Sequence, residues 1–417
     1  MVYFSLPMIS MFTIGYFLIV FEHLIKINKA SIALMMGVLC WVVQFANQGL
    51  SLDDNLAHLG DHLSNISQVI IFLLAAMIIV ETISVHKGFN FITENIKVQS
   101  KRKLFWIIGF MTFFLSSVLD NLTTTIVMIS IIQKIIDDPK DKILFGGGIV
   151  IAANAGGAWT PIGDVTTTML WIGGQISTLN TMIKLILPSL TCFGVSFLCI
   201  NFMLKGDLPK KEIQVEGKEP LGFTVFLLGL GILILIPIFK LVTGLPPYIA
   251  IIFGLGILWF FTDVVHRSPH REHLKMTQIM PKVDLSGPIF FLGILLAINA
   301  LETAGILGNL STFIDSQISN PSIIATTIGL ASSVVDNIPL VAAAMGMYDL
   351  SQYVIDSSFW QLIAYCAGTG GSILIIGSSA GVIYMSMEKV DFMTYAKKIS
   401  LPALAGYFAG IFVYSLL

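Results

Sequence analysis

The sequence predicts an all-α polytopic membrane protein with two inverted-topology repeats, each containing a re-entrant hairpin and a broken transmembrane helix. Of its 417 residues, 55% are hydrophobic and 12% are charged, about half the charged share of an ordinary soluble domain. Apolar runs long enough to span a bilayer recur along the chain. The string "SSVLDN" at 116–121 is also nearly repeated as "SSVVDN" at 332–337. These three observations indicate a duplicated membrane protein.

The apolar runs define the predicted elements. Single spans are expected at 4–25, 30–47, 68–86, 181–204, 221–240, 246–264, 285–301 and 399–416. Runs with a polar or glycine-rich middle lie at 104–136, 145–172, 322–347 and 359–386. The first run has no basic segment before it and no cleavage site of small residues after it, so we expect it to be a retained helix.

Lysine and arginine fall almost entirely in alternate connections. Their clusters lie at 26–29, 87–103, 134–142, 205–218, 267–282 and 389–398, whereas the acidic stretch "DDNLAHLGD" (53–61) lies in an opposite connection. The positive-inside rule then places both termini outside and these clusters in the cytoplasm. No lysine or arginine is expected at the depth of the interrupted runs.

Two of the polar runs are predicted to be hairpins. Run 104–136 has lysines beyond both ends, and as one helix it would reach about 50 Å, well beyond the roughly 30 Å core of a bilayer. Folding back places its tip at Asp120 and Asn121. Run 322–347 has no basic residue at either end, so we expect a hairpin that enters from outside, with its tip at Asp336 and Asn337. A continuous tilted span is the alternative for each run.

Three landmarks recur in the same order in both halves of the chain. Glu81-Thr82 corresponds to Glu302-Thr303 before the hairpins, and a glycine-rich interruption follows each hairpin. The interrupting residues are Gly156, Gly157, Pro161 and Gly163 in the first half, and Gly370, Gly371 and Gly377 in the second. We therefore predict a first repeat at 1–204, a cytoplasmic linker at 205–220 and a second repeat at 221–417. In such architectures the binding site lies near the midplane, at the broken helices.

The polar groups predicted at this depth are oxygen ligands. Carboxylates, amide carbonyls and hydroxyls suit a small hard cation such as Na⁺ or Li⁺. An intramembrane carboxylate costs about 2.5–3.5 kcal/mol to insert, so it indicates a functional site. Burial favours the protonated form of a carboxyl group, so protons can compete with the cation. The structural alternative is that Asp120 and Asp336 cap their helices; if the asparagines cap instead, the aspartates can bind protons.

The motifs resemble those of the NhaD-type sodium/proton antiporters, in a superfamily that also includes arsenite pumps and dicarboxylate/sodium symporters. The strings that carry the resemblance are "SSVLDNLTTTIVM", "NAGGAWTPIGDVTTTMLWIGG" and "SSVVDNIPLVAAAM". It implies Na⁺ or Li⁺ exchange for H⁺, a role in pH homeostasis and sodium tolerance, and a homodimer with a moving transport domain.

By matching position, the implied cation and proton site consists of Asp120, Asn121, Thr160, Asp164, Asp336, Asn337 and Ser378, with Na⁺ as its metal ion. Supporting roles are expected for Ser117, Thr124, Asn154, Thr166, Ser333, Glu81 and Glu302.

Three other functions are weighed. Arsenite or another small oxyanion, and sodium-coupled dicarboxylate, would be carried by the same fold, but aspartates at the tips disfavour an anion. An intramembrane aspartyl protease would need Tyr348-Asp349 to act with Asp164, and the order of these motifs is reversed. We therefore expect a secondary transporter, not an enzyme, with no cofactor, no nucleic-acid partner and lipid as its surroundings. The expected location is a bacterial inner membrane.

Overall fold

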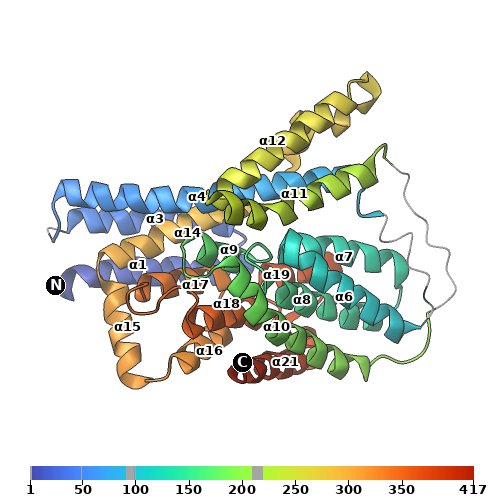
Figure 1. The fold of residues 1–417 in the computed structure, drawn as a ribbon. Coiled ribbons are helices and arrows are strands. Elements are labelled where there is room, and N and C mark those ends of the chain that lie inside the picture. Colours follow the sequence, from blue (N-terminus) through green and yellow to red (C-terminus); the bar gives the residue numbers. More distant parts are fainter. Residues whose placement is uncertain (1, 48, 91–97, 99, 209–218) are drawn as a thin grey trace.

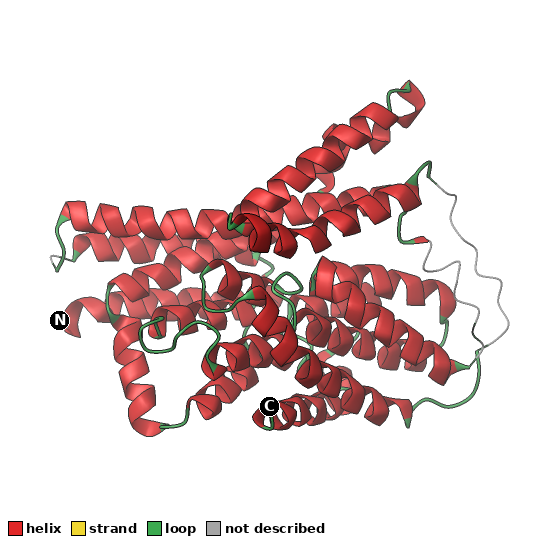
Figure 2. Ribbon diagram, viewed as in Figure 1, coloured by secondary structure: helices red, strands yellow, loops and turns green. Residues whose placement is uncertain are grey.

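The computed structural model describes residues 2–47, 49–90, 98, 100–208 and 219–417, and no β-strand occurs among them (Figure 2). The all-α class is therefore confirmed. Seven of the described helices are long and apolar enough to cross a membrane. Most of the predicted linker 205–220, and part of the basic cluster 87–103, lie outside the described residues.

The helices follow one another along the chain. They are α1 (Val2–Val20), α2 (Glu22–Ile25), α3 (Lys29–Ala46), α4 (Leu52–Val85), α6 (Lys101–Leu119), α7 (Asn121–Ile135), α8 (Pro139–Gly157), α9 (Val165–Ile172), α10 (Thr178–Asn201), α11 (Gly222–Thr243), α12 (Pro247–Val265), α13 (Met276–Ile279), α14 (Ser286–Thr303), α15 (Ile306–Gln317), α16 (Pro321–Ala331), α17 (Asn337–Met347), α18 (Ser358–Gly370), α19 (Ser379–Glu388), α20 (Phe392–Lys398) and α21 (Ser400–Ser415).

The helices form two bundles (Figure 1). Bundle A consists of α1, α3, α4, α11, α12 and α14. In it α3 and α14 approach closely because Gly37 of one faces Gly293 of the other, and the indole of Trp41 donates a hydrogen bond to the carbonyl of Leu296 (3.0 Å). Bundle B consists of α6 to α10 and α16 to α21. The bundles meet where α14 packs on α17 and α4 packs on α9.

The fourth helix differs from its predicted extent. A span was expected at 68–86, with "DDNLAHLGD" as an outer connection, but α4 begins at Leu52 and includes this stretch. Ser51 caps the helix by accepting a hydrogen bond from the amide of Asp54 (3.1 Å). Acidic residues in a first turn also interact favourably with the helix dipole. The acidic stretch therefore extends the helix instead of ending it.

Each of the four runs with a polar or glycine-rich middle contains a helix break, although Gly156 and Gly157 still belong to the last turn of α8 and Gly370 to that of α18. Helices α6 and α7 are separated only by Asp120, and α16 and α17 by residues 332–336. The glycine-rich runs break at 158–164 and 371–378. Corresponding contacts recur in the two halves: Ser116 Oγ donates to the carbonyl of Ala153 (2.6 Å), and Ser332 Oγ donates to that of Ala367 (3.1 Å).

Gly156 lies where α8 and α6 touch through their backbones. A Cβ atom at this position would overlap the carbonyl group of Phe113, which cannot move without breaking α6. We therefore expect Gly156→Ala to destabilise the protein by at least about 1–3 kcal/mol, the usual cost of overpacking. Thermal unfolding of the purified protein in detergent would measure this. Gly194→Ala in α10 is the control, since no atom lies within 4 Å of its added methyl group; equal midpoints for the two variants would contradict the expectation.

Two histidines at helix ends form a buried contact that the sequence pattern does not suggest. His86 follows α4 and His266 follows α12, and their Nε2 atoms lie 3.0 Å apart. Burial lowers the pKa of His86 to about 4 and also lowers the pKa of His266. Both rings are therefore neutral at pH 7, so that one donates and the other accepts. This bond ties α4 to α12 within bundle A.

Candidate functional site

Five buried polar side chains meet inside bundle B and form what we call the polar cluster. Its members are Asn121, Asn154, Asp164, Asn337 and Ser378. They come from both halves of the chain: α7, α8 and the start of α9 in the first, and the starts of α17 and α19 in the second. Four of the five were expected in the cation site from their position, and Asn154 was expected to support it.

Hydrogen bonds connect all members of the polar cluster. The amide nitrogen of Asn121 donates to Asp164 Oδ2 (2.9 Å) and to the amide oxygen of Asn154 (3.0 Å). The amide nitrogen of Asn337 donates to the same Asp164 oxygen at 3.4 Å. Asn154 in turn donates to the hydroxyl of Ser378 (2.9 Å). Asp164 is therefore the acceptor on which both halves converge.

The carboxylate of Asp164 is held by the helix that follows it. Its Oδ1 accepts from the amide of Thr166 (3.0 Å), and Thr167 completes a capping box. A helix N-terminus stabilises a negative charge. Only 2% of the residue is exposed, and no lysine or arginine of the described chain donates to it. A buried carboxylate bonded only to neutral donors can accept a cation from solution.

The segment before Asp164 is shaped by close backbone contacts. A Cβ atom on Gly157 would overlap the carbonyl of Gly163, so the chain can fold back tightly here only with glycine. Thr160 Oγ1 donates to the carbonyl of Ser117 (2.6 Å). The Ser117 hydroxyl donates to the carbonyl of Phe114 (2.7 Å). Thr160 and Ser117 thus join the interruption to the end of α6 and do not contact the polar cluster through their hydroxyls.

Asp120 caps α7. Its carboxylate accepts from the amide (2.8 Å) and hydroxyl (2.9 Å) of Thr123, and its own backbone has φ of 81°. The arrangement in which an asparagine caps and the aspartate is left open is therefore wrong at this helix, because Asn121 points to Asp164. The reason is that the cap position precedes the first helical residue; here Asp120 occupies the cap position and Asn121 is the first residue of α7. Asp120 still lines a cavity together with Asn121.

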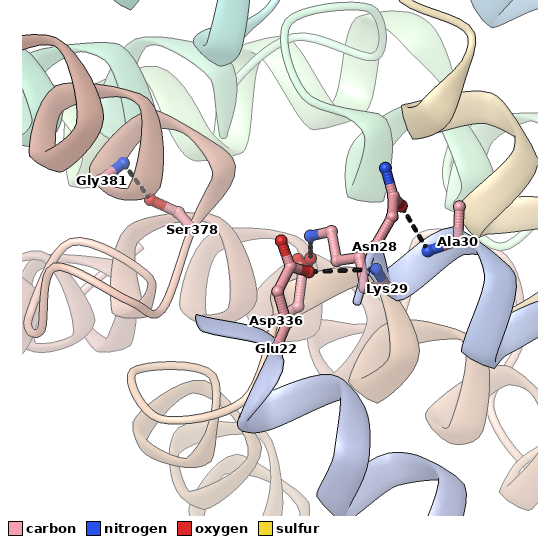
Figure 3. Close-up of polar contacts among 7 residues, drawn as sticks. All are labelled: Glu22, Asn28, Lys29, Ala30, Asp336, Ser378 and Gly381. Atoms are coloured by element: carbon pink, nitrogen blue, oxygen red, sulfur yellow. Dashed lines mark hydrogen bonds and ion pairs between the residues drawn. The ribbon is translucent and has the colours of Figure 1, made fainter. Parts of the chain in front are cut away.

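Asp336 behaves differently from Asp120. The third residue of α17 is Pro339, where α7 has Thr123. Proline has no amide hydrogen to donate, and Asp336 makes no cap bond. Its Oδ2 instead lies 3.3 Å from the ammonium group of Lys29, at the start of α3 (Figure 3). No lysine or arginine was expected at the depth of the interrupted runs, yet Lys29 contacts the tip of the second hairpin run. In the sequence Lys29 lies in the connection between the first two spans, far from residue 336, but folding brings it to this tip.

Several buried oxygen atoms near these helix starts lack a hydrogen-bond partner. They are Thr124 Oγ1, Thr166 Oγ1 and Asp336 Oδ1. Unpaired buried oxygens are costly, so these atoms are available to accept a hydrogen bond or to ligate a cation. The other supporting candidates are not part of this group: Ser333 donates to the carbonyl of Leu330 (2.7 Å), and Glu81 and Glu302 make no hydrogen bond to the polar cluster. Glu302 is exposed.

A cavity of about 300 Å³ is lined by residues of both bundles and reaches the tip of α6 and α7. Bundle B contributes Asp120, Asn121 and Thr123 to its wall. Facing them are Glu22, Asn28, Lys29, Asp284 and Ser286, together with apolar side chains that include Phe72, Phe290 and Phe291. The cavity therefore leads from charged connections of the chain to one side of the polar cluster.

Comparisons with known proteins identify related sequences. Residues 16–361 match a family model described as citrate transporter, CitMHS. Sodium/proton antiporter 1 of Arabidopsis thaliana is 50% identical over 98% of this chain and 72% of that protein. Sodium/proton antiporter 2 of the same plant is 48% identical over 98% of both chains. The Na(+)/H(+) antiporter NhaD of Vibrio cholerae is 31% identical over 97% of this chain and 90% of its own.

The chain belongs to the NhaD-type antiporters. These form part of the ion-transporter superfamily that the citrate transporter model also describes. The antiporter is thus an integral membrane transporter and not an enzyme. The relatives come from plants as well as bacteria, so the family is not confined to bacterial membranes.

Proposed function

We propose that the antiporter exchanges Na⁺ for H⁺ at the polar cluster, with Asp164 as the carboxylate that binds either ion. The observation that carries this is the buried Asp164 side chain, which accepts bonds only from neutral donors. Asn121 and Asn337 donate through their nitrogens, which leaves their amide oxygens available as ligands. Together with the hydroxyls of Thr124 and Thr166 they supply the oxygen ligands that Na⁺ or Li⁺ prefers.

An anion such as citrate or arsenite fits this cluster poorly. Helix N-termini attract anions, and four helices begin here. However, the side chains of Asp120, Asp164 and Ser378 already accept from the first turns of α7, α9 and α19. Two of these caps are themselves carboxylates, which repel a second negative charge. The carboxylates of Asp120 and Asp164 thus occupy the helix N-termini that a substrate anion would need.

The proposed architecture comprises two inverted repeats, at 1–204 and 221–417, joined by the linker 205–220. The corresponding contacts of Ser116 and Ser332 support the repeat. Alternation of the basic clusters supports re-entrant hairpins that enter from opposite sides, with both termini outside. Lys29 and Asp284 lie in connections predicted to be cytoplasmic, so we propose that the cavity opens to the cytoplasm. The resemblance further supports a homodimer in which bundle B moves against bundle A, and Li⁺ as an alternative ion.

Proton movement in everted vesicles with an imposed pH gradient tests the function. NaCl, LiCl, KCl, sodium-free citrate and arsenite are added in turn to vesicles with and without the protein. We expect Na⁺ or Li⁺ to collapse the gradient only when the protein is present. Responses to citrate or arsenite, with none to alkali cations, would favour an anion transporter of the same superfamily.

Asp120 is proposed as the second carboxylate of the exchange, in the wall of the cavity. Asparagine caps helices as well as aspartate does, so Asp120→Asn should keep the thermal midpoint. Exchange should nevertheless fall by about tenfold or more, the effect of about 1.4 kcal/mol in ion binding. Asp120→Ala should lose the cap as well, at about 1 kcal/mol of stability. If Asp120→Asn exchanges Na⁺ at the original rate, Asp120 serves only as a cap.

A further inference from the structure

We propose that Lys29 is a tethered cation that competes with Na⁺ for the second hairpin tip and thereby sets the apparent sodium affinity. The proposal rests on the function proposed above and adds a residue from bundle A. Lys29 Nζ lies 3.3 Å from Asp336 Oδ2. Asp336 precedes Asn337, which donates to Asp164. The lysine charge therefore contacts the residue that directly precedes a member of the polar cluster.

The position of Lys29 is fixed by its own helix. It is the first residue of α3, whose start is capped by Asn28 accepting from the amide of Ala30 (2.8 Å). The backbone amide of Lys29 donates to Glu22 Oε2 (3.3 Å) (Figure 3). The ammonium group of Lys29 lies 4.5 Å from the ring centre of Phe290. A lysine at a helix N-terminus is disfavoured by the helix dipole, and α3 has no acidic residue in its first turn. The contacts with Asp336 and Phe290 offset this cost.

Asp336 is available to Lys29 because Pro339 denies it a cap. One carboxylate oxygen accepts from the lysine, while Oδ1 is buried with no partner. A sodium ion that approaches Asp336 must therefore share this carboxylate with the ammonium group or displace it. The two side chains are partly screened, with 31% of Lys29 and 14% of Asp336 exposed. A pair of this exposure contributes only modestly to stability.

The pair also joins the two bundles. Lys29 belongs to bundle A and Asp336 to bundle B, and Lys29 lines the cavity that leads to Asp120. Competition at Asp336 therefore links ion binding to a contact that must break if the bundles move apart. Removing the lysine charge should make sodium binding tighter, whereas loss of a merely structural residue would not.

The test compares KM for Na⁺ and maximal rate in purified protein reconstituted into liposomes. Lys29→Gln should lower KM by about two- to fivefold, as expected for an ion pair of this exposure. Lys29→Arg keeps the charge and should restore the original KM. Lys26→Gln is the matched control, an exposed lysine three positions earlier in the same connection. An unchanged or higher KM in Lys29→Gln would overturn the proposal.

A second measurement does not depend on transport. Sodium-induced thermal stabilisation is titrated in detergent in two backgrounds, the unaltered protein and Asp336→Asn, each with and without Lys29→Gln. Without the carboxylate there is nothing to compete for, so the lysine change should have no further effect on the sodium midpoint. An equal shift in both backgrounds would overturn the role of Asp336 as partner. If the unaltered protein and Lys26→Gln show no Na⁺/H⁺ exchange, the proposed function fails instead, whatever Lys29 does.

Discussion

Asp164→Asn is expected to abolish Na⁺/H⁺ exchange while the protein still folds. Asparagine can keep the cap on α9, because its amide oxygen accepts from Thr166 as the carboxylate does. It removes the only carboxylate within the polar cluster and with it the group that a proton and a cation would share. Hydrogen bonds to a charged group are worth about 1.5–3 kcal/mol. We therefore expect sodium binding to weaken by about 10- to 150-fold, measured as loss of sodium-dependent thermal stabilisation and of proton movement in vesicles.

The matched control for this variant is Asp391→Asn. Asp391 caps α20 by accepting from the amide of Thr394 (2.9 Å), and it is exposed and remote from the cluster. The same chemical change at a cap should therefore leave exchange intact. Exchange by Asp164→Asn at the unaltered rate, in protein with the normal thermal midpoint, would remove Asp164 from the ion site.

Asn121→Ala is expected to have the second largest effect, and a larger one than Asn337→Ala. Asn121 donates to Asp164 and Asn154, whereas Asn337 makes one longer bond to Asp164. Removing Asn121 leaves the Asn154 oxygen without this donor and loosens the carboxylate, at about 1–3 kcal/mol. The KM for Na⁺ should rise by about 10- to 100-fold. Asn337→Ala should raise it by less.

Reconstituted exchange with a range of sodium concentrations measures both values. Asn309→Ala, on the exposed face of α15, controls for loss of an amide elsewhere. An Asn337→Ala effect equal to or greater than that of Asn121→Ala would show that the shorter bonds do not determine how the carboxylate is held.

Helix breaks could be predicted from the sequence because they have local causes. Asp120, Pro161 and Gly163 stand inside apolar runs, and proline and glycine there interrupt the pattern of a continuous helix. The helical class follows similarly from run length and composition. Less predictable was the extent of α4, because the acidic residues after Ser51 suit either a connection or a capped first turn. Only packing against α3, where Gln44 donates to Asn55 (3.0 Å), distinguishes the two.

The members of the site were easier to predict than their partners. Asn121, Asp164, Asn337 and Ser378 stand at matching positions of the two predicted repeats, so the predicted repeat leads one to expect that they meet. The capping role of Asp120 and the contact between Asp336 and Lys29 depend on a single difference, Thr123 in one half and Pro339 in the other. The Lys29 contact joins residues 307 positions apart, and no local pattern encodes a pairing at that separation.

The polar cluster takes members from both halves of the chain, and this has a consequence for how the molecule is held together. An ion that ligates Asp164 with the amide oxygens of Asn121 and Asn337 would reversibly cross-link the two halves of the chain. Whatever binds only the folded form stabilises it in proportion to its concentration. The free energy of unfolding should therefore increase as the concentration of Na⁺, the transported ion, increases.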